Sequence, residues 1–262
     1  MELTIVGCSG SVPGPDSPAS SYLIQAPYEG RIFSFVLDLG PGAFGALYRY
    51  LDPGTVDAIG LSHLHPDHCL DVCAFYVGSK YSPTAATWRQ IPIFGPTGSA
   101  ARLAAAYEVP NVAAEEPGPG IAAHFDWRDW QPDQQIGPFD VSTVPVAHPV
   151  EAYAIRITER VPSGGSMVFS GDTGPCAALS DLARGVDVLL VESAFMAGPN
   201  NPANLHLTGR EAAEAGAAAG VGSIILTHIP PWFDRTAVLS EATPHFDGPV
   251  MLAEPGAHWP IG

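Results

Sequence analysis

The feature that most limits the fold of this chain is a series of short apolar runs, rich in β-branched residues, that recur along its length. Runs of this kind, bounded by Gly, Pro, Asp or Ser, are typical of β-strands. We expect strands at residues 3–6, 22–25, 32–37, 58–61, 91–94, 141–146, 152–157, 167–169, 186–191, 223–226 and 250–252. Helices are expected at 43–50, 69–78, 98–107, 175–183, 208–219 and 235–245. A chain that begins mainly with strands and then alternates strands with helices favours an α/β fold, with helices packed in layers on sheets.

Length and composition indicate a globular protein. The 262 residues are 46% hydrophobic and 15% charged, which is enough apolar surface for a sizeable core. Residues 109–120, rich in Pro, Gly, Ala and Glu, are the expected flexible loop or insertion. No internal repeat with a solenoid period is visible. We therefore expect a single domain that spans residues 1–262.

The charge of the chain argues against a long nucleic acid as its partner. Eleven basic residues stand against 27 acidic ones, which gives a formal net charge of −16, and Lys80 is the only lysine. Proteins that grip a polyanion usually carry a basic stripe, because neutralising phosphates supplies most of the non-specific affinity. A small anionic substrate is still compatible with this charge, since a bound cation dominates the field within a site.

The apolar segments and the cysteines indicate the cellular compartment of the protein. The longest apolar runs are far shorter than the roughly 20 residues that a bilayer requires, and the first residues lack the basic segment of a secretory signal. We expect a cytoplasmic protein without membrane spans. The cysteines, Cys8, Cys69, Cys73 and Cys176, are scattered, which favours free thiols. Cys69 and Cys73 lie one helical turn apart and allow a metal site, but small buried residues are the favoured interpretation.

Three of the nine histidines fall within six positions, in the stretch HLHPDH at 63–68. This stretch follows an expected strand, and Pro66 suits a turn from which a helix starts near Asp67. Histidine and carboxylate are ligands for zinc, manganese or iron. The stretch therefore offers four candidate ligands: His63, His65, Asp67 and His68.

Four ligands are too few for two metals, so a di-metal site requires partners further along the chain. Three are found within three positions of the ends of expected strands: His148 after 141–146, Asp172 after 167–169, and His228 after 223–226. The competing interpretation is a set of unrelated turn histidines with Asp172 as a helix cap. The joint pattern favours a metal site.

The ordered set HxHxDH, His, Asp, His resembles the metallo-β-lactamase superfamily, over nearly the whole chain. The segments VGCSGSVPGP, LLVESAF and HLTGREAAEAG resemble the branch that contains ribonuclease Z and related phosphodiesterases. The segments SGSVPGPDSPAS, SHLHPDHCLD, SGDTG, ARGVDVLL and LTHIPPW are similar to actinobacterial cyclic-nucleotide phosphodiesterases of this superfamily. The resemblance implies a single-domain, four-layer αββα sandwich.

The resemblance also implies how the ligands are shared. One metal would be held by His63, His65 and His148, the other by Asp67, His68 and His228, with Asp172 bridging them. Two divalent cations are implied, with Zn²⁺ expected and Mn²⁺ as the alternative. Such a pair lies ~3.5–4 Å apart, acidifies a bridging water and clamps the oxygens of an in-line displacement. The implied nucleophile is a metal-bridging hydroxide.

Three residues are implied to be catalytic. Asp67 would also orient the nucleophile or accept its proton. His206 would act as general acid on the leaving oxygen or stabilise the phosphate, although a role in capping the helix near Thr208 is the alternative. Glu192 would orient His206. The family pattern has His before this glutamate and Thr two positions after it, where this chain has Val191 and Ala194, so a plain strand-end glutamate is the alternative.

The remaining polar positions are open or structural. Ser9 and Ser11 lie in a glycine-containing loop that either offers donors to a phosphate or forms only a tight turn. Asp38 and Gly40 resemble a structural turn of the family and are not expected to be catalytic. The histidines outside any ligand pattern are expected to be ordinary surface or core residues: His124, His245 and His258.

The first reading of function is hydrolysis of a small phosphodiester, with a 3′,5′-cyclic nucleotide opened to a nucleoside monophosphate. The second is ribonuclease Z-type cleavage at tRNA 3′ ends, although the candidate insertion is short and acidic rather than basic. A third is hydrolysis of a lactone, thioester or β-lactam, because the same site can attack a carbonyl carbon. A non-enzymatic, metal-stabilised binding module is the last alternative. The family also suggests a homodimer.

Overall fold

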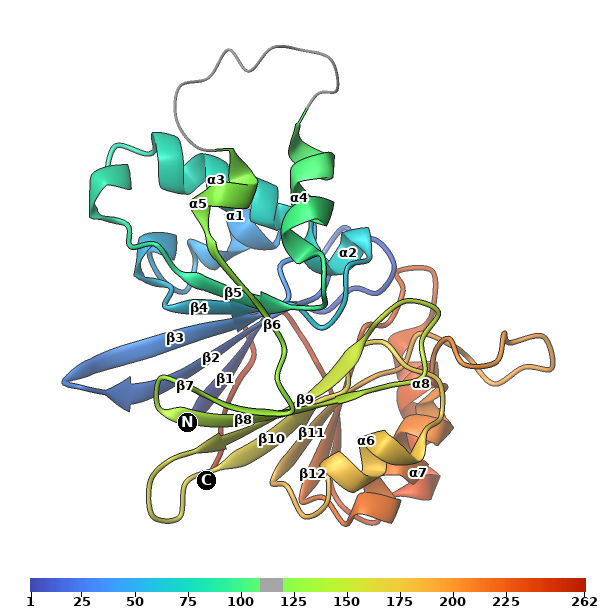
Figure 1. Cartoon of the computed structure of the whole chain (residues 1–262). Coiled ribbons are helices and arrows are strands. Elements are labelled where there is room, and N and C mark those ends of the chain that lie inside the picture. The colour runs from blue at the N-terminus through green and yellow to red at the C-terminus, as the bar shows by residue number, and fades with distance from the viewer. Residues whose placement is uncertain (109–119) are drawn as a thin grey trace.

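The computed structural model describes residues 1–108 and 120–262, and it contains two seven-stranded sheets packed face to face (Figure 1). The first sheet has the order β14-β1-β2-β3-β4-β5-β6 and the second β13-β12-β11-β10-β9-β8-β7. The first comprises β1 (Glu2–Gly7), β2 (Ser21–Tyr28), β3 (Arg31–Leu37), β4 (Ala58–Gly60), β5 (Pro92–Gly95), β6 (Asp126–Asp129) and β14 (His258–Pro260). The second comprises β7 (Asp133–Ile136), β8 (Phe139–Pro145), β9 (Tyr153–Glu159), β10 (Ser166–Phe169), β11 (Val188–Glu192), β12 (Ser223–Thr227) and β13 (Val250–Leu252).

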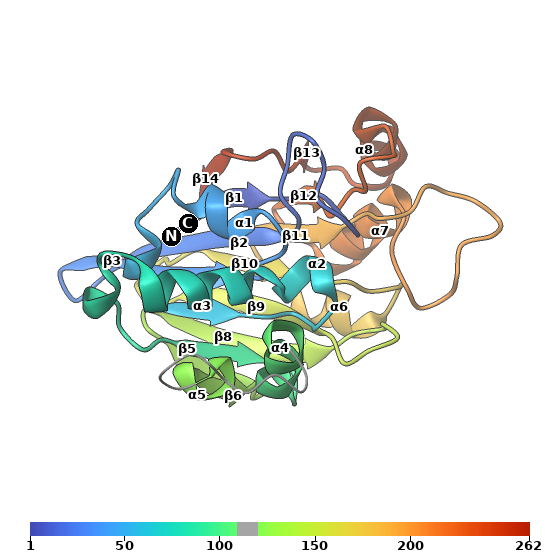
Figure 2. The same cartoon turned by 90° about the horizontal axis from the view of Figure 1, so that it is seen from above.

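Helices cover the outer face of each sheet, as Figures 1 and 2 show from two directions. On the first sheet lie α1 (Ala43–Leu47), α3 (Asp71–Tyr81), α4 (Ser99–Tyr107) and α5 (Ile121–His124), with the short α2 (Pro66–Cys69) at its end. On the second lie α6 (Ala177–Leu182), α7 (Gly209–Ala219) and α8 (Arg235–Ala242). The predicted four-layer αββα sandwich is confirmed. Within the described ranges, no helix has the length and apolar character that crossing a membrane requires.

The strands are apolar on both faces because each sheet is an inner layer. Along β11, Val188 and Leu190 point into the core between the sheets, whereas Leu189 and Val191 point to the helices outside. The same two-residue period divides β12, where Ile225 faces the other sheet. A strand covered on both sides reads as a continuous apolar run, which explains why such runs predicted the strands well.

The strands that the sequence did not predict lie at sheet edges. β6 and β14 border the first sheet, and β7 borders the second. The sequences DWRD of β6 and DQQI of β7 are polar because an edge strand is partly solvated, and β14 is a strand of only three residues, HWP. The helix expected at 69–78 is divided at Leu70 into α2 and α3, and the helices expected at 43–50, 175–183 and 235–245 are shorter than predicted. The loop expected at 109–120 lies outside the described residues, apart from Gly120.

The strand directions bring several strand ends to one side of the molecule. In the first sheet β3, β4, β5 and β6 are parallel, and in the second β10 to β13 are parallel. β8 also runs parallel to β10, because each is antiparallel to β9. Ligands in such sheets bind beyond the carboxyl ends of the strands, and the candidate site residues follow these ends.

Candidate metal centre

The histidine-rich stretch 63–68 comprises the end of the turn after β4 and the first three residues of α2. Pro66 occupies the first position of α2, where its missing N–H costs nothing, and His65 precedes the helix in an extended conformation. Gly40 holds this turn against the first sheet: a Cβ on Gly40 would lie 1.9 Å from the Asp67 carbonyl oxygen. The close approach therefore requires glycine at position 40.

One group of four side chains gathers where this turn meets the second sheet: His63, His65, His148 and Asp172. Their ligand atoms lie within 4.8 Å of one another. His65 Nδ1 is 3.0 Å from His63 Nε2 and 3.1 Å from His148 Nε2. His63 is buried, whereas His65 and His148 are half-buried, so this group is the more open of the two.

A second group shares Asp172 and is buried throughout: Asp67, His68, Asp172 and His228. His228 Nε2 lies 3.1 Å from both His68 Nε2 and Asp67 Oδ2. Asp172 Oδ1 lies 3.2 Å from His68 Nε2, and its Oδ2 faces the first group, 3.7 Å from His63 Nε2. The structure thus brings together all seven candidate ligands around one carboxylate. Asp172 does not cap a helix, because α6 begins after Cys176.

The chemistry of these residues fits divalent cations. Two imidazole nitrogens 3.0 Å apart satisfy each other only if one of them is protonated, whereas a cation satisfies both. Asp172 Oδ1 is buried without a hydrogen-bond partner among the described residues, which a metal would supply.

The outer ring nitrogens also match a metal site, because ligating histidines usually bond through the second nitrogen to a fixed acceptor. His68 Nδ1 faces Asp38 at 2.7 Å, His148 Nδ1 faces the Leu205 carbonyl at 3.0 Å, and His63 Nδ1 faces the Ser62 hydroxyl at 3.1 Å. His228 does not follow this pattern, since its buried Nδ1 has no such partner among the described residues.

Asp38 is the residue whose role the sequence analysis missed. It follows β3, is fully buried with a φ of 55°, and accepts hydrogen bonds from the Ser62 N–H and hydroxyl at 2.7 and 2.8 Å besides facing His68. Burial raises the pKa of this carboxyl, although the charge of His68 offsets part of the effect. The signal was present: Asp38, like Asp172, is an acidic residue that follows the end of a buried strand.

The electrostatics separate the histidines into two kinds. Burial lowers the pKa of His63 well below its usual value and also lowers the pKa values of His65 and His148, so these rings are neutral and ready to ligate. Burial acts in the same direction on His68, but Asp172 and Asp38 outweigh it and hold its pKa well above the usual range. A proton on His68 therefore supplies positive charge that the carboxylates need when no cation is bound.

The carboxylates show the complementary shifts. Burial acts to raise the pKa of Asp67, but hydrogen bonds with His228 and His68 outweigh it and keep the pKa below its usual range. For Asp172 the charges of His228 and His68 likewise outweigh burial and lower the pKa. Both groups are anionic and gathered around positive charge, as ligands of a cation are.

His206 and Glu192 form a pair beside these groups. Glu192 is fully buried, and its Oε1 lies 2.8 Å from His206 Nδ1. His206 Nδ1 is 3.9 Å from Asp172 Oδ2. Burial acts to lower the pKa of His206, but the bond to Glu192 outweighs it and raises the pKa.

The alternative roles weighed for this pair are wrong. Thr208, not His206, caps α7, because the Thr208 hydroxyl accepts from the Glu211 N–H and the Glu211 carboxylate accepts from the Thr208 N–H. Glu192 is no solvated strand-end residue either. Besides facing His206 it accepts from the N–H groups of Thr173 and Ala194.

The other polar positions are placed as follows. The Ser11 N–H lies 3.3 Å from His228 Nε2, so the loop after β1 reaches the site, while the Ser9 hydroxyl donates to the Val12 carbonyl. The cysteine thiols lie outside the ligand groups, and the Cys69 thiol donates to the His65 carbonyl. The three histidines without a ligand pattern also lie elsewhere: His124, His245 and His258.

Comparison with known proteins identifies the family. The sequence profile described as the beta-lactamase superfamily domain matches residues 34–229. The chain belongs to the metallo-β-lactamase superfamily, and it is a metallo-hydrolase of that fold.

Relatives with curated sequences fall into three kinds. The uncharacterized protein ML1173 of Mycobacterium leprae is 44% identical over 100% of this chain and 89% of its own length. The probable metallo-hydrolase YhfI of Bacillus subtilis is 29% identical over 99% of both chains. A ribonuclease Z of Mycobacterium bovis BCG is 30% identical over 88% of this chain and 86% of its own length.

Solved structures agree on the fold. The crystal structure of Bacillus subtilis YhfI superposes with a TM-score of 0.82 at 25% identity and covers 98% of each chain. The short form of human tRNase Z superposes with a TM-score of 0.72 at 20% identity, over the full length of both chains.

Proposed function

We propose that the protein is a di-metal phosphodiesterase that hydrolyses a small phosphodiester, best matched by a 3′,5′-cyclic nucleotide that opens to a nucleoside monophosphate. The observation that carries the proposal is the His206–Glu192 pair beside Asp172, the carboxylate shared by both ligand groups. A phosphodiester needs one set of groups for the attacking water and another for the leaving oxygen. The two ligand groups and His206 supply both.

The ligand groups would hold two divalent cations, zinc or manganese, with Asp172 between them. Bound there, the cations would supply Lewis-acid charge to the phosphate and lower the pKa of water. Asp67 belongs to the second group, where its Oδ2 lies 3.1 Å from His228 Nε2, and we assign it the further role of orienting the attacking water. Asp38 and the Leu205 carbonyl fix the tautomers of His68 and His148, so that Nε2 of each ring faces inward.

His206 is assigned to the leaving oxygen. Glu192 occupies Nδ1, and no described residue hydrogen-bonds Nε2, which leaves that nitrogen for the substrate. The N–H groups of Thr173 and Ala194 hold the Glu192 carboxylate in place, so the His206 ring is fixed on one side. When water attacks phosphorus, the P–O bond to the ribose breaks, and the departing oxygen requires a proton. His206 is positioned to give it.

Cleavage of precursor tRNA is the second candidate, and it is favoured by the 30% identity to a ribonuclease Z. Two observations rank it lower. The net charge of −16 opposes a polyanion, and the basic residues consist of Lys80 and ten dispersed arginines. A small phosphodiester requires no such basic surface.

The test offers metal-loaded protein cyclic AMP, cyclic GMP, bis(p-nitrophenyl) phosphate and a precursor tRNA side by side. We expect the small phosphodiesters to be cleaved and a cyclic nucleotide to have the highest kcat/KM. Cleavage of the tRNA far faster than of the cyclic nucleotides would reverse the ranking. A lactone or β-lactam cleaved while every phosphodiester stays intact would overturn the proposal.

A further inference from the structure

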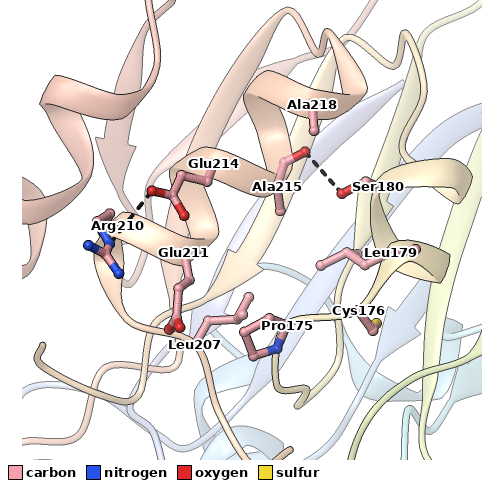
Figure 3. A pocket seen from close by; sticks show the side chains of 11 residues that line it. Pro175, Cys176, Leu179, Ser180, Leu207, Arg210, Glu211, Glu214, Ala215 and Ala218 are labelled. Atoms are coloured by element: carbon pink, nitrogen blue, oxygen red, sulfur yellow. Dashed lines mark hydrogen bonds and ion pairs between the residues drawn. The ribbon is translucent and has the colours of Figure 1, made fainter. Parts of the chain in front are cut away.

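A cavity of about 400 Å³ opens beside His206. Its walls come from the segment between β11 and α7, which projects from the molecule in Figures 1 and 2, and from the first turn of α7. Ligand pockets have volumes of roughly 300–1,000 Å³, so a nucleoside is within its capacity. A second cavity of about 460 Å³ lies between α6 and α7 (Figure 3) and shares Pro175, Arg210 and Glu211 with the first.

The exposure of the ligand groups places this cavity on the open side of the site. His68 and His228 are buried, whereas His65, His148 and His206 are half-buried. The Leu205 carbonyl that faces His148 belongs to the same projecting segment as the cavity wall. A substrate therefore reaches the ligand groups from the side on which the cavity lies.

We propose that this cavity holds the nucleoside part of the substrate and that Asn204 and Arg210 select it, an inference that rests on the proposed phosphodiesterase function. In a cyclic nucleotide both ester oxygens belong to one ribose. The ribose must therefore lie against His206 when its oxygen leaves, and the attached base must occupy the adjoining space.

Asn204 has the properties of a residue that reads a base. Its φ is 55°, and its backbone packs on Gly174, where an added Cβ would lie 2.6 Å from Asn204 Cα. Its side-chain amide hydrogen-bonds no other described residue, although it lines the cavity. An amide offers a donor and an acceptor together, which matches the edge of a nucleobase.

Arg210 is the basic residue in the walls of both cavities. Its Nε lies 3.6 Å from Glu214 Oε1, as the dashed line in Figure 3 marks, and about half of its side chain is exposed. A planar guanidinium can stack on a base or bond to it. Thr208 and Glu211, which also line the cavity, are occupied with each other in the cap of α7.

Trp232 is an alternative position on which the base could stack, and an experiment must distinguish it from the cavity. It is 61% exposed and lies four positions after His228, but it does not line the cavity. The ligand that it follows in the chain, His228, is buried. If the base stacked there, the loss of Trp232 would weaken nucleotide binding and the cavity variants would not.

The test compares two substrates in metal-loaded, full-length protein. Asn204→Gly removes the amide and tolerates the positive φ, and Arg210→Ala removes the guanidinium. Bis(p-nitrophenyl) phosphate has no nucleoside. We expect the KM for cyclic AMP to rise about fivefold or more in each variant, the loss expected for one polar contact, with kcat little changed. Activity on bis(p-nitrophenyl) phosphate should stay near wild type. Arg184→Ala, which removes another exposed arginine paired with an acid, is the control and should leave both substrates unaffected.

The outcomes separate this inference from the proposed function. Unchanged KM values for cyclic AMP, an equal loss on both substrates, or a KM increase confined to Trp232→Ala would overturn the inference and leave the phosphodiesterase proposal standing. Wild-type protein that cleaves bis(p-nitrophenyl) phosphate but neither cyclic AMP nor cyclic GMP would also overturn the inference, and the phosphodiesterase proposal would stand without a cyclic nucleotide as its substrate. Failure to cleave any phosphodiester would overturn both.

Discussion

The Asp38→Asn variant isolates what one buried carboxylate contributes to metal binding. Asp38 is 0% exposed, and its two oxygens accept from Ser62 and face His68 Nδ1 at 2.7 Å. Asparagine has nearly the same shape and tolerates the φ of 55° at this position. It nevertheless replaces one acceptor oxygen with an NH₂ donor.

Both orientations of the new amide lose a hydrogen bond. If the NH₂ faces His68, Nδ1 must accept, so the proton moves to Nε2, the nitrogen that faces the other ligands. If the oxygen faces His68, the NH₂ opposes the Ser62 N–H. A buried polar group without a partner costs about 1–3 kcal/mol. Loss of the partner of a ligating histidine typically lowers metal affinity about 10–100-fold.

We therefore expect Asp38→Asn to lower the free energy of unfolding in urea by about 1–3 kcal/mol and the affinity for Zn²⁺, measured against a chelating dye, by about 10–100-fold. Asp57→Asn is the matched control. The Asp57 carboxylate accepts from the Ser34 N–H and pairs with Arg31 and Arg89, but it belongs to neither ligand group. It should lose stability and keep its metal affinity. Wild-type Zn²⁺ affinity in Asp38→Asn, or the same affinity loss in both variants, would refute this reasoning.

Three further outcomes are expected. Asp172→Ala should lose both its metal and its hydrolytic activity. His206→Ala should have a kcat lower by about 10²–10⁴-fold but retain its metals, as measured by elemental analysis. Metal loss from His206→Ala would contradict the assignment of His206 to the leaving oxygen. A chelator should lower the unfolding temperature in scanning calorimetry, and added metal should restore it, because a ligand at 100 times its Kd stabilises the folded state by about 2.7 kcal/mol. An unchanged unfolding temperature would contradict metal binding by the folded protein. Gly40→Ala should lower the free energy of unfolding by about 1–3 kcal/mol, because the new Cβ would clash with the Asp67 carbonyl. Gly45→Ala in α1, where a Cβ would meet nothing within 4 Å, should raise it by about 0.4–1 kcal/mol. Equal changes for the two variants in urea unfolding would contradict the proposed need for glycine at position 40.

The inner strands were predictable because burial on both faces leaves a strong apolar signal. The run 186–191 was expected as a strand, and β11 spans Val188–Glu192 with every residue buried. β6 and β7 were not predicted from the sequence because their polar residues form strands only by pairing with β5 and β8, and that pairing is a tertiary property. The division of the predicted helix at Leu70 was not predicted for a similar reason. The Leu39 carbonyl accepts from the Asp71 N–H, and the Leu39 N–H donates to the His68 carbonyl, so a residue distant in sequence interrupts the helix.

The convergence of the ligands could be predicted because the carboxyl ends of parallel strands meet at one edge of a sheet. A histidine or aspartate that follows such a strand is therefore expected at that edge. Asp38 also follows a strand, but its sequence looked like a turn, and only the 2.7 Å approach to His68 shows what it contacts. The cavity beside His206 had no local signal, since its walls come from loops without periodicity. The native metal, the homodimer and the cytoplasmic location stay predictions.

The two ligand groups draw equally on both halves of the sandwich. The turn after β4 brings His63 and His65 to one group and Asp67 and His68 to the other, and in each case strand ends of the second sheet complete the set. Neither half supplies all four members of either group. A cation held by either group would join the two sheets, so its binding would favour the assembled chain, and its loss would remove that contribution to the free energy of unfolding.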